Sequence, residues 1–211
     1  MKVTIFGATG RTGQELVSQA LDRGFDVVAF ARDSTKITCD DSRLAKVSGY
    51  LSNQEQLKAA ILGSDAVLSA LGPMGKPSDS ELSDGIANIV AVMKECGVRR
   101  LVALSTTSAQ DPSDQDNRRA QFKRDMIRRG RPTSYEQIVR YSQLIRDSDT
   151  DWTLVRIASI LTSAPLSQQV SVGYVGKGRL RVTLSRANLA WFMLEQLTNI
   201  EHIKQAPALS N

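Results

Sequence analysis

A glycine-rich run, Gly7-Ala-Thr-Gly10-Arg-Thr-Gly13, lies where the apolar pattern of the chain changes its period. Residues 3–6 before it form a short β-rich stretch, whereas the apolar residues after it recur at helical spacing. Glycine allows a sharp turn off a strand, close approach of a ligand to the backbone, and close packing of a helix on the strand. The run therefore predicts a strand, a tight turn and a helix in that order.

The elements that follow complete a βαβ unit. Gly24 is expected to end the helix, residues 26–30 to form a second strand, and the apolar face of the helix to consist of Leu16, Val17, Ala20 and Leu21. Free N–H groups at the start of such a helix, with the positive end of its dipole, favour a pyrophosphate. An ordinary tight turn would use similar glycines, but the flanking strands favour dinucleotide binding.

The residue that ends the second strand indicates which nucleotide binds. An Asp or Glu there would bind the ribose hydroxyls of NAD, but positions 31 and 32 are Ala and Arg. The guanidinium of Arg32 suits a 2′-phosphate, and Arg11 and Lys36 add positive charge nearby. We therefore expect NADP(H). The alternative is that Arg32 and Lys36 are solvated surface charges and that Asp33 binds the ribose.

Strands and helices alternate along much of the remaining chain. Further helices are expected at residues 53–62 and 81–96, an irregular strand pair at 170–184, and further strands at 44–48, 65–71, 100–105 and 152–157. This alternation predicts an α/β fold, a doubly wound parallel sheet of the NAD(P)-binding Rossmann type, in a single domain of residues 1–211. Ligands bind beyond the carboxyl ends of such strands, so one cleft should be shared by the loops after Phe6, Phe30, Leu71, Ser105 and Ile157.

Composition excludes several classes of protein. Hydrophobic residues make up 41% of the 211 residues and charged residues 23%, as in ordinary globular proteins, and no apolar run is long enough to span a membrane. Met1-Lys2 leads directly into a strand rather than a signal peptide, so a cytoplasmic location is expected. Cys39 and Cys96 lie far apart and His202 is the single histidine, so neither a zinc site nor a disulfide framework is expected.

Much of the net charge of +5 comes from residues 117–131. Against the single acid Asp125, this segment carries Arg118, Arg119, Lys123, Arg124, Arg128, Arg129 and Arg131. A solvated, mobile lid is the favoured interpretation, and a patch that selects an acidic ligand is the alternative. Nucleic-acid binding ranks third, because Phe122 is the only aromatic residue among these charges and a stacking platform needs more.

Seven stretches of the chain, in order, carry a resemblance to a known family. They are residues 28–34, 65–72, 84–94, 101–104, Asp151-Trp-Thr-Leu-Val-Arg156 and 185–194, together with the glycine run. Over nearly its whole length the chain resembles the atypical short-chain dehydrogenases/reductases of the NmrA-like group, and within that group it is most similar to the flavin reductases. The resemblance implies an NADP(H)-binding oxidoreductase.

The resemblance also implies roles for individual residues. The pyrophosphate loop would comprise Gly7, Thr9, Gly10, Arg11, Thr12 and Gly13. Arg32 and Lys36 fall where the 2′-phosphate is held, and Leu51 falls where an apolar residue lines the adenine. Leu71 and Gly72 fall beside the nicotinamide ribose, and Thr106 close to the nicotinamide. The C-terminal part, about residues 157–211, would contribute the substrate side.

Three positions depart from the pattern of the group. Tyr50 stands where the group usually has an Asp beside the adenine. Ile138 and Ser159 replace histidines that lie near the substrate in a flavin reductase that binds tetrapyrroles. Tetrapyrrole binding is therefore not implied for this chain.

The chemistry follows from a missing residue pair. Many short-chain dehydrogenases reduce a carbonyl with a Tyr-x-x-x-Lys pair, but the residues four positions after Tyr50, Tyr135, Tyr141 and Tyr174 are Gln54, Val139, Ile145 and Gly178. Tyr135 with Thr106 would form only an incomplete site. Flavins and quinones need no positioned protein acid, because water can protonate the reduced heteroatom.

We therefore expect an NADPH-dependent reductase that transfers hydride to a small-molecule acceptor, a flavin or a quinone. Thr106 is the candidate catalytic residue, as a hydrogen-bonding neighbour of the nicotinamide. The alternative is an NADP(H)-binding redox-sensing regulatory protein without turnover. No membrane partner is expected, nucleic acid is an unlikely partner on this reading, and the oligomeric state is left open.

Overall fold

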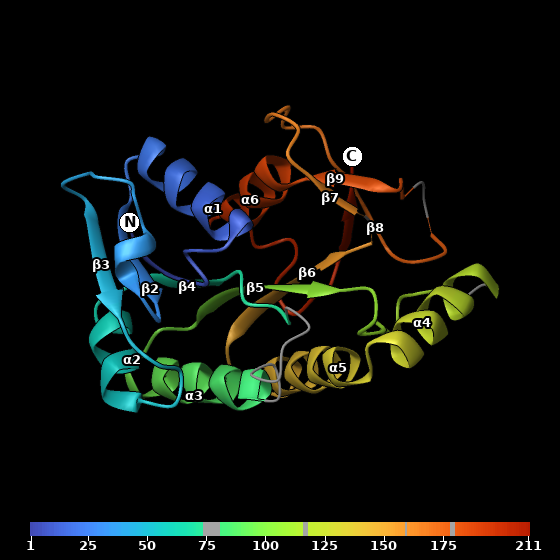
Figure 1. Ribbon diagram of the computed structural model, residues 1–211, viewed down its shortest axis with the longest axis horizontal. Helices are drawn as coiled ribbons and strands as arrows, with labels where there is room; N and C mark the ends of the chain where they lie inside the picture. Colours follow the sequence, from blue (N-terminus) through green and yellow to red (C-terminus); the bar gives the residue numbers. More distant parts are fainter. Residues whose placement is uncertain (74–80, 116–117, 159, 178–179) are drawn as a thin grey trace.

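The central sheet of the protein runs through the middle of the computed structural model, which describes residues 1–73, 81–115, 118–158, 160–177 and 180–211 (Figure 1). It is an eight-stranded sheet in the order β3-β2-β1-β4-β5-β6-β10-β8. The strands are β1 (Lys2–Phe6), β2 (Asp26–Ala31), β3 (Leu44–Ser48), β4 (Ala66–Ser69), β5 (Arg100–Thr106), β6 (Asp151–Ile157), β8 (Ser171–Gly173) and β10 (Ala208–Ser210). Neighbouring strands are parallel except β8, which runs antiparallel to β10. The predicted doubly wound parallel sheet is confirmed, with the strand order reversing between β1 and β4.

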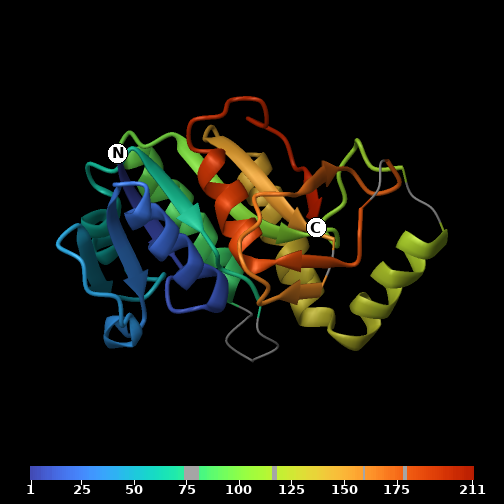
Figure 2. The same ribbon diagram turned by 90° about the horizontal axis from the view of Figure 1, so that it is seen from above.

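Helices cover both faces of this sheet. In Figure 1, α1 (Arg11–Asp22) and α6 (Arg186–Glu195) lie on one face, and α2 (Gln54–Ile61), α3 (Leu82–Glu95) and α5 (Pro132–Arg146) lie on the other. A short helix, η1 (Ser34–Lys36), follows β2. Helix α4 (Arg118–Gly130) extends past the end of α5, away from the sheet, and β7 (Ile160–Thr162) pairs with β9 (Thr183–Ser185) in a separate two-stranded sheet (Figure 2).

The hydrophobic core has two layers, one on each face of the sheet. Val3 and Ile5 of β1 pack with α1 and α6, whereas Phe6 packs with α2, α3 and α5. Central strands that are buried on both faces read as nearly continuous apolar runs, which is why their positions could be predicted from the sequence. Polar groups inside are paired, since the hydroxyl of Thr4 donates to the carbonyl of Ala60 at 2.6 Å.

Several expectations about the second half of the chain need correction. The segment after β5 forms two helices, α4 and α5, which the alternation of apolar residues did not predict. In the described parts of residues 170–184, β8 pairs with β10, and β9 begins at residue 183 and pairs with β7, so these strands do not pair with each other as expected. The strands involved have three residues each and their partners are distant in sequence, so no local pattern marks them.

Cys39 and Cys96 are free thiols. Within the described ranges, no cluster of His, Cys, Asp and Glu could hold a metal ion. The same residues include no helix that is both long enough and apolar enough to cross a bilayer.

The glycine run makes the sharp turn between β1 and α1. Gly7 has a φ of +77°, which favours glycine. A Cβ built on Gly13 would lie 2.0 Å from the carbonyl oxygen of Gly7 and 2.8 Å from the Cα of Ala8. A Cβ on Gly10 would meet its nearest atom, again the carbonyl oxygen of Gly7, at 3.3 Å. Gly7 and Gly13 are therefore required by the fold, whereas Gly10 tolerates a side chain with a small adjustment.

We predict opposite consequences for substitutions at Gly13 and Gly10. Gly13→Ala pushes a methyl group into backbone, which cannot move aside, so the free energy of unfolding should fall by roughly 2–3 kcal/mol. Gly10→Val should lower it by about 1 kcal/mol or less, because only a helix N-cap changes, but should abolish NADPH binding. Urea unfolding and nucleotide titration measure both effects. Equal unfolding free energies for Gly13→Ala and the parent protein would contradict this account of the turn.

Candidate functional site

The register of the sheet brings the carboxyl ends of its strands to one edge. Phe6 of β1 is paired with Phe30 of β2 and with Ser69 of β4, and Thr106 of β5 is paired with Ile157 of β6. Phe6, Phe30 and Ser69 therefore lie level in the sheet, whereas Ser69 is paired with Ala103, so β5 and β6 run three residues further before their loops begin. This is the edge at which doubly wound sheets bind their ligands.

The first part of the site is the N-terminus of α1. Gly10 is its N-cap, no side chain caps the helix, and its first turn contains no acidic residue. Gly10 is exposed and Gly7 is half-buried, so the backbone of the turn faces the solvent at this edge. An uncapped N-terminus with small residues before it fits an anion such as a pyrophosphate.

Positive and negative charges lie together after β2. Arg32 is exposed, and the Lys36 ammonium lies 3.3 Å from a carboxylate oxygen of Asp33 with 70% of the lysine side chain exposed. Asp33 accepts hydrogen bonds from the hydroxyl and the backbone N–H of Thr35, at 2.6 and 3.1 Å. The Thr35 hydroxyl bond in particular, assisted by Lys36, lowers the pKa of Asp33. These groups already occupy the Asp33 carboxylate, whereas Arg32 is exposed at the same turn.

Leu51, Leu71 and Gly72 lie further along the same edge, and all are half-buried. A Cβ on Gly85 of α3 would lie 2.6 Å from the side chain of Leu51, so this glycine allows Leu51 to pack on α3. The side chain of Asn88 also donates to the carbonyl of Leu51 at 2.9 Å. Among the residues that the structure describes, no atom lies within 4 Å of a Cβ built on Gly72.

Thr106 is the last residue of β5 and is half-buried. Its hydroxyl oxygen accepts a hydrogen bond from the backbone N–H of Ser108 at 3.2 Å, which places it in the turn that leaves the strand. Tyr135 is half-buried in the first turn of α5. Thr106 belongs to the strand before the basic segment 117–131, and Tyr135 belongs to the helix after it.

Tyr141, the tyrosine that packs on β5, has a structural role. Its side chain is 1% exposed, and its hydroxyl donates to the carbonyl of Leu104 at 3.1 Å. Burial raises the pKa of Tyr141 to about 12. Of the two positions that depart from the histidines of the tetrapyrrole-binding flavin reductase, Ile138 is buried in the core and Ser159 lies outside the described residues.

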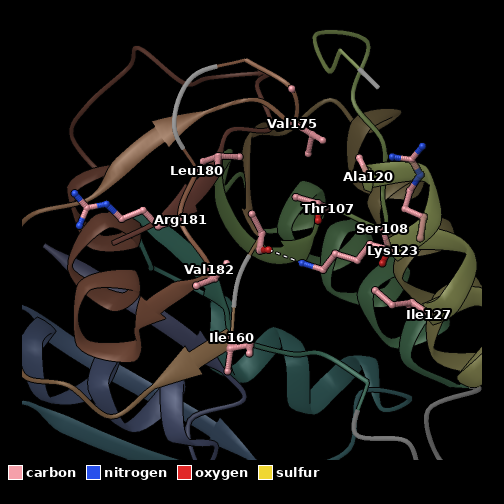
Figure 3. Close-up of a pocket in the computed structure, with 13 residues that line it drawn as sticks. Thr107, Ser108, Ala120, Lys123, Ile127, Ile160, Val175, Leu180, Arg181 and Val182 are labelled. Carbon is pink, nitrogen blue, oxygen red and sulfur yellow. Dashed lines mark hydrogen bonds between the residues drawn. The ribbon is translucent and has the colours of Figure 1, made fainter. Parts of the chain in front are cut away.

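A cavity of about 540 Å³ lies next to the end of β5, between α4 and the β7–β9 pair (Figure 3). Its lining combines apolar, small and cationic residues: Thr107, Ser108, Ala120, Lys123, Arg124, Ile127, Ala158, Ile160, Val175, Gly176, Leu180, Arg181 and Val182. None of these described lining residues is acidic. The Lys123 ammonium extends across the cavity and donates to the carbonyl of Ala158 at 2.7 Å (Figure 3).

The cavity gives part of the basic segment a definite place. Lys123, Arg124 and Ile127 face the cavity from α4, whereas Phe122 and Met126 on the other side of this helix are 67% and 59% exposed. No described residue of α4 is buried, so the side of the helix that faces away from the cavity is exposed to solvent. This exposure agrees with the expectation that the basic segment is solvated. The cavity was not predicted from the sequence because its opposite wall combines Ile160 of the three-residue strand β7 with residues 180–182 before β9, and neither stretch carries a periodic signal.

Sequence analysis also missed a buried ion pair close to the cavity. Arg156 of β6 is 0% exposed, and its guanidinium donates to both carboxylate oxygens of Asp114 at 2.7 and 2.8 Å. Burial pushes the pKa of Asp114 upward, but the bonds from Arg156 and from the backbone outweigh it and hold the pKa below its usual value. A charged residue inside the apolar stretch Trp152-Thr-Leu-Val-Arg156-Ile was the available signal.

Comparison with known proteins agrees with the geometry. Residues 7–200 match the model of a protein family described as NAD(P)H-binding. A (4-alkanoyl-5-oxo-2,5-dihydrofuran-3-yl)methyl phosphate reductase of Streptomyces griseus is 27% identical over 161 residues, 76% of this chain and 49% of that protein. The chain thus spans about half the length of this relative. The uncharacterised protein YwnB of Bacillus subtilis is 23% identical over 208 residues, 96% of this chain and 94% of that protein.

Solved structures show the same fold. A short-chain dehydrogenase/reductase of Veillonella parvula, in complex with NADP, superposes with a TM-score of 0.82 at 17% identity and covers 100% of this chain and 94% of that one. The oxidoreductase YlbE of Lactococcus lactis also has a TM-score of 0.82, at 18% identity, and covers 100% of this chain and 91% of that one.

Proposed function

The chain belongs to the NAD(P)H-binding family, and we propose that it is an NADPH-dependent oxidoreductase that transfers hydride to a flavin, a quinone or a similar acceptor. One observation carries the proposal. The cavity of about 540 Å³ begins at Thr107, directly after the last residue of β5, and so adjoins the edge of the sheet that fits the nucleotide. Its volume lies within the roughly 300–1,000 Å³ usual for small-molecule sites.

The residues at this edge bind and orient the nucleotide, which supplies the hydride when bound. The N–H groups at the start of α1 hold the pyrophosphate, and Arg32 contacts the 2′-phosphate. Leu51 lies against the adenine, Leu71 and Gly72 lie beside the nicotinamide ribose, and Thr106 lies beside the nicotinamide. Residues 157–211 provide the acceptor side, to which Ala158, Ile160 and Val182 of the cavity belong.

The proton is supplied by water rather than by a side chain. Tyr141 is buried, hydrogen-bonded to a backbone carbonyl and has a raised pKa, so it cannot deliver a proton to the cavity. The position four residues after Tyr135 is Val139, so no lysine activates that tyrosine. An acceptor whose reduced form is protonated by solvent fits this set of residues.

The cavity favours an acceptor with an apolar ring system and a negative charge. Lys123, Arg124 and Arg181 supply positive charge, and the apolar lining lies between them. FMN, in which a ribityl chain joins a phosphate to an aromatic ring system, combines these features. Two similarities support this choice: the sequence motifs resemble those of the NmrA-like flavin reductases, and the Streptomyces griseus relative is named as the reductase of a phosphate-bearing compound.

A redox-sensing protein that binds NADP(H) without turnover is the second candidate. The absence of any Tyr-x-x-x-Lys pair in the sequence fits both candidates and favours neither decisively. Assaying NADPH oxidation with a panel of flavins, quinones and dyes separates the two candidates. We expect turnover with at least one flavin or quinone, whereas tight NADPH binding without turnover for every acceptor would favour the sensor.

The first prediction for this site concerns the choice of cofactor. Arg32→Ala should weaken NADPH binding while leaving NADH binding nearly unchanged, because one charge-assisted contact contributes on the order of 1.5–3 kcal/mol. Arg43→Ala is the matched control, since Arg43 is an exposed arginine that pairs with Asp41 before β3. Titration of both nucleotides measures the effect. Equal affinity of the parent protein for NADPH and NADH would contradict the role of Arg32.

The second prediction concerns the source of the proton. Thr106→Ala should lower the rate of NADPH oxidation because Thr106 is proposed to lie beside the nicotinamide, but Tyr135→Phe should change it little. Loss of a general acid typically costs about 10²- to 10⁴-fold, so a drop of that size in Tyr135→Phe would disprove solvent protonation. The assay uses FMN and a small quinone across pH, with NADPH affinity measured in parallel.

The third prediction concerns the charge of the acceptor. Lys123→Ala should raise the KM for FMN by about tenfold, because a cation near the phosphate is lost, and should change the KM for a small uncharged quinone much less. Arg129→Ala on the same helix removes an equal charge outside the cavity lining and serves as control. An equal change for FMN and the quinone would show that Lys123 acts only as a wall of the cavity.

A further inference from the structure

Two segments that are far apart in sequence form part of the wall of the cavity. Thr107 and Ser108 belong to residues 107–115, which we call the β5 loop. Val175 and Gly176 belong to residues 174–177, which we call the β8 turn, closed by a hydrogen bond from the N–H of Lys177 to the carbonyl of Tyr174 at 3.0 Å. The width of the cavity on this side depends on how these two segments are held together.

Asp114 joins the β5 loop to the β8 turn. One of its carboxylate oxygens accepts from Arg156 at 2.8 Å and from the backbone N–H of Val175 at 2.9 Å. The other accepts from Arg156 at 2.7 Å and from the backbone N–H of Asp111 at 3.0 Å. The Asp114 side chain is 3% exposed, so these donors satisfy a buried charge.

Arg156 anchors this junction to the sheet. Besides Asp114, its guanidinium donates to the carbonyl of Ala109 in the β5 loop at 3.1 Å and to the carbonyl of Ala206 before β10 at 2.6 Å. Its central carbon also lies 5.8 Å from the ring centre of Tyr174 in the β8 turn. One side chain on β6 thus contacts both walls.

Two further contacts hold the β5 loop and the β8 turn together. The backbone N–H of Gln115 donates to the carbonyl of Val175 at 2.7 Å. A Cβ on Gly176 would lie 1.7 Å from the carbonyl oxygen of Gln115, so the β8 turn can approach the β5 loop this closely only because this residue is glycine. The loop is also held from α5, where Arg146 lies 3.3 Å from Asp111.

We propose that Arg156 and Asp114 are positioning residues for the hydride acceptor, because they fix the separation between the β5 loop and the β8 turn. The inference rests on the proposed function, since it concerns the same cavity. An exposed pair could hold two segments only weakly, whereas this pair is buried, bidentate and shared with the backbone of both walls. Removing it lets the walls separate, so the acceptor loses its alignment while the nucleotide edge stays intact.

The experiment compares two variants that disturb the junction in different ways. Asp114→Asn is isosteric and removes the charge that Arg156 and Val175 share, whereas Gly176→Ala pushes the turn off the loop and leaves the ion pair in place. Two matched controls lie elsewhere. Asp151→Asn breaks the exposed pair with Arg99 at the other end of β6, and Gly97→Ala adds a methyl group at a φ of +71° with no atom within 4 Å.

Three quantities are measured for each variant: the KM for FMN, the Kd of FMN in the presence of NADP⁺, and the Kd of NADPH. In Asp114→Asn and Gly176→Ala, we expect the KM and Kd for FMN to rise by about tenfold or more, because small displacements in a site have large effects. In the two test variants, the Kd of NADPH should stay within about a factor of two of the parent value. In the two control variants, all three quantities should stay within the same factor, because the energetic effects of distant sites are usually independent. Hydrogen exchange at the amides of Val175 and Gln115 should accelerate in the two test variants alone.

The results that overturn the proposal are distinct from those that overturn the proposed function. If the amides of Val175 and Gln115 lose protection while the FMN constants match the parent, the junction does not position the acceptor. If NADPH affinity falls in parallel with FMN affinity, the pair supports the whole edge instead, and the proposal is also wrong. A parent protein that binds FMN but never oxidises NADPH contradicts the proposed function, while the FMN Kd values still test the junction.

Discussion

The contact between α1 and the turn after β1 determines where the rest of the site can form. The positive φ of Gly7 and the missing Cβ of Gly13 bring the first turn of α1 against the backbone of residues 7 and 8. This contact fixes the helix N-terminus at the carboxyl end of β1. The strand order of the sheet reverses next to this strand, between β1 and β4. Arg32, Leu51, Leu71 and Thr106 are then placed along one edge by the parallel register of the neighbouring strands.

The two halves of the site are built by different physical means. The edge proposed for the nucleotide consists of strand ends and backbone turns whose positions follow from the sheet, and Arg32, Leu51, Leu71 and Thr106 there are exposed or half-buried. The cavity proposed for the acceptor is assembled from α4, the β5 loop, the β8 turn, residues 158 and 160 at the start of β7, and residues 180–182 before β9. Buried ion pairs are weak sources of net stability, so the position of Arg156 and Asp114 beside the cavity suits a role in placing its walls.

The first half of the fold could be predicted from the sequence because it carries strong local signals. Apolar strands, an amphipathic α1, the Asn53 cap of α2 and glycines at turns mark the elements from β1 to β5 to within about two residues. The second half lacks such signals. The charges of α4 hide its helical nature, and strands of three residues such as β7 and β10 depend on distant partners.

The site was predictable to a different extent. The glycine run and the edge of the sheet follow from patterns within the chain, and two of the glycine roles are confirmed by the space around Gly7 and Gly13. The cavity and the Arg156–Asp114 junction depend on contacts between segments some 40 to 60 residues apart in sequence, which no periodicity reveals. Only the charged Arg156 within a buried strand indicated that a partner was needed.

A crystal structure of the complex with NADP⁺ tests the central claim most directly, because it locates both ends of the nucleotide at once. The account predicts the pyrophosphate at the N–H groups that start α1, the 2′-phosphate beside Arg32, and the nicotinamide ring beside Thr106 with one face open to the cavity. A hydride acceptor placed in that cavity would then come within about 3–3.5 Å of the ring. A nicotinamide that points away from the cavity, or a nucleotide bound at another edge of the sheet, would contradict the account.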